Sequence, residues 1–202
     1  MEQFTYPDAP HVRRHGPRGY SESGSYQPWL RDEFKFRCVY CLARERWHKG
    51  QFGFQVDHVV PKSKAPLRTL DYDNLVYACE TCNEMKSDAA GIRGPCETAY
   101  HECLRVHKDG TIAALNPEGQ ILIAVLRLDN DNVENTEFRR LMFEVICLAR
   151  KKDPAMYSRL MGFPDDLPNL ARKRPPGGNS RPEGIRESYQ ARRARNELPE
   201  TY

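Results

Sequence analysis

Four short motifs between residues 38 and 86 decide the fold: Cys38-Val39-Tyr40-Cys41, Val56-Asp57-His58-Val59-Val60-Pro61-Lys62, Asn74-Leu75 and Cys79-Glu80-Thr81-Cys82-Asn83-Glu84-Met85-Lys86. Two CxxC pairs thus enclose an Asp-His dipeptide and an asparagine. The arrangement predicts a structural metal site folded around a second, more reactive group of side chains.

The two CxxC pairs predict one closed metal site. A CxxC turn can place two thiolates on one Zn²⁺, and two such turns complete a tetrahedral site with no open position. A gap of 37 residues, 42–78, separates the pairs, and we expect this long gap to carry a functional loop. The predicted ligands of a structural zinc are Cys38, Cys41, Cys79 and Cys82. The unpaired cysteines are expected to be small core residues: Cys96, Cys103 and Cys147.

The secondary structure around these motifs is predicted as strand, long loop, strand and helix. Residues 51–57 alternate between apolar and polar types, which is typical of a strand. Residues 75–78 form a second short apolar run, and a proline-rich loop of about fifteen residues separates the two, a length that usually signals function. Residues 80–90 contain good helix formers and precede Gly91, which predicts a helix that ends there.

Side chains within the gap suit phosphodiester chemistry. Asp57 offers a hard oxygen ligand for Mg²⁺, and the imidazole of His58 can accept a proton from water near neutral pH. Asn83 follows a zinc ligand and offers a second oxygen, while Asn74 can hold the loop in shape through its amide. Alone, an Asp-His pair at a strand end is more often a turn with a surface histidine. The joint occurrence within two CxxC pairs favours a site.

These motifs resemble the zinc-containing branch of the HNH endonuclease family over about residues 28–90. The resemblance implies an α+β, ββα-metal fold around one catalytic Mg²⁺ or Mn²⁺. It implies that His58 is the general base, that Asp57 and Asn83 are metal ligands, and that Asn74 orients the site. Many members have histidine at the position of Asn83, and asparagine there favours the oxygen-preferring Mg²⁺.

The implied activity is metal-dependent hydrolysis of DNA phosphodiester bonds, in a bacterial or phage setting of defence or mobility that rests on the resemblance alone. Lys62 and Lys86 are candidates for phosphate contacts, although a solvated surface lysine is as good an interpretation of each. Two alternatives stay open. One is an RNA-directed nuclease, since no residue pattern identifies the sugar. The other is a zinc-stabilised nucleic-acid-binding or adaptor protein without catalysis.

The remaining chain is expected to flank the HNH module at residues 26–94 with a flexible arm (1–25), an accessory α+β extension (95–168) and a basic, Pro/Gly-rich tail (169–202). Residues 171–202 carry eight Lys or Arg against four Asp or Glu, which suits a polyanion or a solvated tail. A hairpin around 108–110 and a helix over 133–150 are predicted. For residues 116–126 we favour helix over strand.

Composition points to a reducing setting. The seven cysteines are an odd number, residues 1–24 are polar rather than a secretory leader, and no apolar run approaches a membrane span. We therefore expect a cytoplasmic protein without a membrane partner, whose paired cysteines bind metal. Double-strand cleavage would need two copies or two events, which leaves a homodimer or larger complex open.

Overall fold

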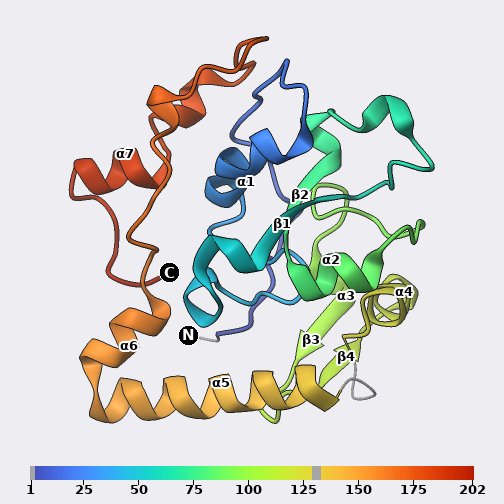
Figure 1. Ribbon diagram of the computed structural model, residues 1–202. Helices are drawn as coiled ribbons and strands as arrows, with labels where there is room; N and C mark the ends of the chain where they lie inside the picture. The colour runs from blue at the N-terminus through green and yellow to red at the C-terminus, as the bar shows by residue number, and fades with distance from the viewer. Residues whose placement is uncertain (1–2, 129–132) are drawn as a thin grey trace.

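A computed structural model describes residues 3–128 and 133–202. At its centre lie two antiparallel strands and a helix (Figure 1), namely β1 (Phe54–His58), β2 (Leu75–Cys79) and α2 (Glu80–Lys86). The register pairs Phe54 with Cys79 and His58 with Leu75, and α2 packs on both strands. The predicted order of strand, loop, strand and helix is confirmed, and the fold is the α+β, ββα-metal type.

The bounds of two central elements differ from the prediction. Residues 50–53 form a 3₁₀ turn, so β1 begins only at Phe54. α2 ends at Lys86 instead of reaching Ala90, because Ser87 has a left-handed φ of 44° and its N–H bonds back to the carbonyl oxygen of Asn83. A residue with positive φ cannot continue a right-handed helix.

Helix α1 (Gln27–Glu33) packs against the finger formed by β1, β2 and α2. A proline in its first turn suits the helix start, and the side chains of Trp29 and Leu30 are fully buried against β2 and its surroundings. The acidic residues Asp32 and Glu33 are buried too. A helix end that buries two carboxylates needs partners for them, and the two ends of the described chain supply these partners.

The extension beyond residue 95 is mixed. It contains α3 (Tyr100–Cys103), a hairpin of β3 (Leu104–Val106) and β4 (Ile112–Ala114), then α4 (Pro117–Leu126), α5 (Val133–Lys152) and α6 (Pro154–Met161). The hairpin and the long helix match their predictions, and α4 settles the ambiguous segment as helix because Asn116 caps it by accepting from the N–H of Gly119. α5 runs along one edge of the molecule (Figure 1).

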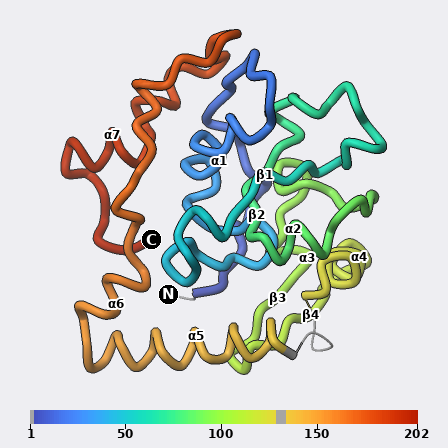
Figure 2. The backbone as a smooth tube through the Cα atoms, viewed as in Figure 1, coloured from blue at the N-terminus to red at the C-terminus, as the bar shows by residue number. Residues whose placement is uncertain are grey.

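The N-terminal arm, from residue 3 on, and the basic, Pro/Gly-rich tail both pack on the molecule. Phe4 and Tyr6 are buried in the main core. Arg18 and residues 177–178 exchange backbone hydrogen bonds, so the arm and the tail run side by side (Figure 2). The tail includes α7 (Tyr189–Ala194), and Tyr189 packs with Phe36 and Phe163 in a second apolar cluster. A few aromatic residues anchor these two segments, although their composition is otherwise polar.

No helix in the described ranges combines the length and the apolar character that a bilayer span requires.

Candidate metal centre and adjoining polar site

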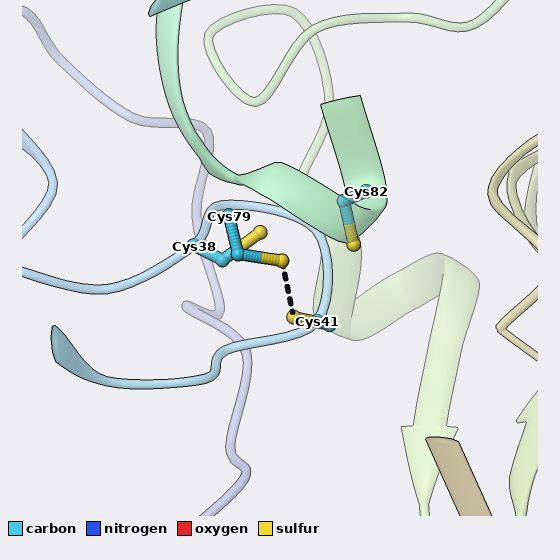
Figure 3. Close-up of side chains that lie close together, drawn as sticks. All are labelled: Cys38, Cys41, Cys79 and Cys82. Atoms are coloured by element: carbon cyan, nitrogen blue, oxygen red, sulfur yellow. Dashed lines mark hydrogen bonds between the residues drawn. The ribbon is translucent and has the colours of Figure 1, made fainter. Parts of the chain in front are cut away.

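The four predicted cysteines converge on one point (Figure 3). Their sulfur atoms all lie within 4.8 Å of one another, and Cys41 Sγ is 3.6 Å from Cys79 Sγ. Four thiolates at about 2.3 Å from a central Zn²⁺ would lie about 3.8 Å apart, so the donor set and its spacing fit a structural zinc. Three of the four residues are buried, and Cys41 is half-buried, as expected for a closed site.

Local backbone structure places each pair. The first pair lies in a tight turn in which the N–H of Cys38 bonds to the carbonyl oxygen of Ala43 and the N–H of Leu42 bonds to that of Cys38. Cys79 ends β2, and Cys82 lies in the first turn of α2. The N–H of Val39 donates to the carbonyl oxygen of Tyr77 at 3.0 Å. This bond joins the first turn directly to β2 and brings the two pairs together.

The other three cysteines lie outside this cluster. Cys103 is buried and Cys96 is half-buried, but Cys147 is exposed on α5. The expectation that Cys147 belongs to the core is therefore wrong. Cys147 directly follows the buried Ile146 in sequence but does not lie on the buried face of α5, which includes Met142, Ile146 and Ala149.

Asp57 is buried at the end of β1, and both of its carboxylate oxygens accept hydrogen bonds. The Tyr40 hydroxyl donates to Oδ2 at 2.6 Å, while the His58 N–H and the Lys86 ammonium donate to Oδ1 at 2.7 Å and 3.2 Å. Burial raises the pKa of Asp57 above its ordinary value, and Lys86 and Tyr40 oppose that rise. The carboxylate is therefore held in one orientation.

The ring of His58 contacts the long loop between β1 and β2. Its Nε2 lies 2.9 Å from the carbonyl oxygen of Thr69. A carbonyl oxygen only accepts, so Nε2 carries the proton and Nδ1 of the neutral ring is a proton acceptor. Among the described residues, Nδ1 has no hydrogen-bond partner. Burial lowers the pKa of His58, and the charge of Lys62 lowers it further, which favours the neutral ring that a base requires.

Asn74 is almost fully buried and joins the two ends of the long loop. Its Oδ1 accepts from the N–H of Val60 at 2.9 Å, and its Nδ2 donates to the carbonyl oxygens of Val60 and Arg68 at 3.1 Å and 3.2 Å. The bond to Arg68 fixes the backbone directly before Thr69, whose carbonyl oxygen accepts the hydrogen bond from the His58 ring. Asn74 thus holds the loop that orients the histidine.

Asn83 and Lys86 lie three residues apart and so share one face of α2. Asn83 is half-buried, and its Nδ2 donates to Gln55 Oε1 at 2.7 Å, whereas Lys86 pairs with Asp57. Gln55 and Asp57 lie two residues apart and share one face of β1. The same surfaces of α2 and β1 therefore carry the predicted ligands Asp57 and Asn83.

The oxygen donors at this interface suit a hard divalent ion. Asn83 Oδ1 accepts no hydrogen bond from any described residue, and the Asp57 carboxylate lies on the facing strand. A carboxylate plus an amide oxygen, with water completing the shell, is a donor set that Mg²⁺ accepts.

The two predicted lysines occupy different environments. Lys62 is exposed on the loop after β1, close enough to affect the charge state of His58. Lys86 is buried, and its ammonium donates to the carbonyl oxygen of His58 at 2.6 Å as well as to Asp57. The structure therefore contradicts Lys86 as a surface phosphate contact, because its charge is already used inside the protein.

Sequence reasoning missed two contributors to the site. These are Tyr40, within the first CxxC pair, and Thr69, in the long loop. The role of Thr69 depends on its backbone carbonyl, which no side-chain pattern can indicate. For Tyr40, its place between two metal ligands was the one available signal.

Comparison with known protein families gives one result. Residues 38–89 match the family model for the HNH endonuclease, a segment that spans β1, β2, α2 and all four clustered cysteines. No curated protein matches the chain. The geometry of the finger agrees with this match over residues 38–89, and the four-cysteine cluster is consistent with the zinc-binding branch of the HNH endonuclease family.

Proposed function

We propose that the protein is an endonuclease that hydrolyses phosphodiester bonds of DNA. In this proposal His58 Nδ1 takes a proton from a water molecule, which then attacks the phosphorus atom in line with the leaving oxygen. The carbonyl oxygen of Thr69 holds the ring so that Nδ1 faces the substrate, and Asn74 holds the neighbouring backbone at Arg68. Asp57 and Asn83 bind the divalent ion.

A bound Mg²⁺ or Mn²⁺ would neutralise charge that develops on the phosphate and the leaving oxygen.

The observation that carries the proposal is the fixed tautomer of His58. Its Nε2 is committed to a carbonyl oxygen at 2.9 Å and its pKa is lowered, so the ring is neutral and basic at Nδ1. A free Nδ1 on a ring held in this way is the arrangement that a general base requires.

The test is cleavage of supercoiled plasmid by wild type and by His58→Ala in Mg²⁺ or Mn²⁺. Loss of a positioned general base typically costs about 10²- to 10⁴-fold in rate, and we expect a decrease of that size. The matched control is His101→Ala, because His101 is an exposed histidine on α3 and should leave the rate unchanged. Zinc content and circular dichroism establish that both variants are folded.

Other outcomes separate the alternatives. Cleavage of an RNA oligonucleotide but not of plasmid would favour the RNA-directed nuclease. A folded, zinc-loaded wild type that binds DNA and cuts neither substrate would favour the adaptor protein. Equal cutting by wild type and His58→Ala would exclude His58 as the base.

We further expect Lys62 to contact a backbone phosphate near the scissile bond. Replacing Lys62 with glutamine in the inactive His58→Ala background should reduce the slope of log affinity against log salt by about 1, with weaker binding to all DNA sequences. The control is Lys108→Gln in the β3–β4 turn, which carries an exposed lysine away from the finger. Identical slopes for both variants would show that Lys62 does not touch the substrate.

A further inference from the structure

Tyr40 connects the four-cysteine cluster to the proposed catalytic ion site. It lies between Cys38 and Cys41, and its hydroxyl donates to Asp57 Oδ2 at 2.6 Å. Its side chain is fully buried, and Asp57 is 4% exposed. The hydrogen bond is thus shielded from water, where charge-assisted bonds to a carboxylate are strongest.

Tyr40 is itself held by the fold. The hydroxyl of Tyr6 donates to the carbonyl oxygen of Tyr40 at 2.5 Å, and the preceding residue, Val39, bonds through its N–H to the carbonyl oxygen of Tyr77. Metal ligands stand on both sides of it within the same turn. The position of the Tyr40 ring is therefore set by the geometry of the first CxxC turn.

The hydroxyl of Tyr40 restrains Oδ2 of Asp57, which accepts from no other group in the part of the chain that the structure describes. Oδ1 of Asp57 already accepts from the N–H of His58 and from Lys86, and Oδ2 accepts from Tyr40. Without Tyr40 the carboxylate could turn about its bond to Cβ. Groups that orient a metal-binding carboxylate typically contribute about 10- to 100-fold to metal affinity or activity.

We propose that Tyr40 is a positioning residue, which transmits the geometry of the four-cysteine turn to Asp57 and so sets the affinity for the catalytic divalent ion. The inference rests on the proposed function, because that proposal assigns Asp57 as an ion ligand. It adds a role for the CxxC turn beyond stability. The four-cysteine metal shapes the neighbouring ion site through one hydrogen bond.

The competing explanation is that the Tyr40 hydroxyl only satisfies a buried carboxylate. The chain offers a matched control for that explanation, because Tyr77 is also fully buried and its hydroxyl donates to Glu45 Oε1 at 2.7 Å. Tyr77→Phe and Tyr40→Phe each remove one hydroxyl from one buried carboxylate. Only Tyr40→Phe removes it from the proposed ion ligand.

The experiment measures Mn²⁺ binding directly, by electron paramagnetic resonance of free Mn²⁺, on zinc-loaded full-length protein without nucleic acid. Zinc remains at the thiolates, since Mn²⁺ prefers oxygen ligands. We expect Tyr40→Phe to raise the dissociation constant for Mn²⁺ about tenfold or more, and Tyr77→Phe to leave it within about threefold of wild type. Zinc content should stay at the wild-type value in both.

A second variant covers the case in which Tyr40→Phe does not fold. Tyr6→Phe removes the bond to the Tyr40 carbonyl oxygen and keeps the Tyr40 hydroxyl, and it should weaken Mn²⁺ binding by a smaller factor. Equal affinities in wild type and Tyr40→Phe would overturn the inference, as would equal losses in Tyr40→Phe and Tyr77→Phe or a wild type that binds no Mn²⁺. Weaker Mn²⁺ binding by Tyr40→Phe in a protein that cuts no nucleic acid would sustain the inference and reject the proposed function.

Discussion

Replacing Cys82 with serine is expected to unfold the HNH domain. Cys82 is one of four sulfur donors within 4.8 Å of one another, and this cluster joins the turn at 38–41 to the junction of β2 and α2. Structural zinc in small domains contributes an apparent binding free energy of about 10–16 kcal/mol. The free energy of unfolding of a typical domain is about 5–15 kcal/mol, so loss of the zinc can remove all of it. Far-UV circular dichroism, with zinc content measured on the same sample, would show the loss of structure and metal together.

The control for this change is Cys147→Ser. Cys147 is exposed on α5 and lies outside the cluster, so this variant should keep both its zinc and its spectrum. Chelation of zinc from the wild type should reproduce the Cys82→Ser spectrum, and adding zinc back should reverse it. A metal-free wild type with an unchanged spectrum would refute the structural role of the cluster.

Replacing Glu33 with glutamine should lower the free energy of unfolding by about 3 kcal/mol at neutral pH. The Glu33 carboxylate is fully buried and accepts hydrogen bonds from His11 Nε2, the backbone N–H groups of Arg14 and His15, and the hydroxyl of Tyr72, at 2.7–3.1 Å. Burial disfavours the charged carboxylate and raises its pKa. The hydrogen bonds and the neighbouring histidines outweigh this effect and lower the pKa from 4.5 to about 2. A shift of about 2.5 units corresponds to roughly 3 kcal/mol.

The sign of the pKa shift fixes the pH dependence of this contribution. Because the folded pKa lies below the unfolded one, the stabilisation is complete above about pH 4.5 and disappears as the pH falls towards 2. Urea unfolding at pH 7.5 measures the full effect. Glu197→Gln is the control, since its partner Arg195 and the carboxylate are both largely exposed, and its stability should match wild type. A Glu33→Gln protein as stable as wild type would show that the buried donors contribute nothing.

The parts of the fold that the sequence predicted are those that local chemistry determines. Two CxxC pairs leave few arrangements for four thiolates, and the short apolar run at 75–78 has room only for a strand. Gly110, which has a φ of 87° in the β3–β4 turn, predicted the hairpin. The helical spacing of apolar residues in α5 predicted the long helix. In each case the signal and the structure lie within about twenty residues of chain.

Long-range pairing of charges could not be predicted. Asp32 and Glu33 are ordinary at a helix end, and nothing nearby in sequence indicates that His15 would lie 2.9 Å from Asp32 Oδ2 or that the N–H of Tyr189 would bond to Oδ1 of the same carboxylate. These contacts hold the arm and the tail against α1, and the polar composition of the two segments does not indicate them. The prediction that Lys86 contacts phosphate was wrong for the same reason, because its partner Asp57 lies on a different element.

The shared core also bears on how such a nuclease domain can be moved between proteins. The span that matches the family model, 38–89, is smaller than the unit that folds, since Trp29, Tyr6 and Tyr100 belong to the same apolar cluster as β2. A transplant of 38–89 alone would expose that cluster to water. Fusing residues 38–89 to another protein would therefore require that protein to supply aromatic side chains that bury this cluster. The flanking sequence can diverge as long as it buries the same apolar surface.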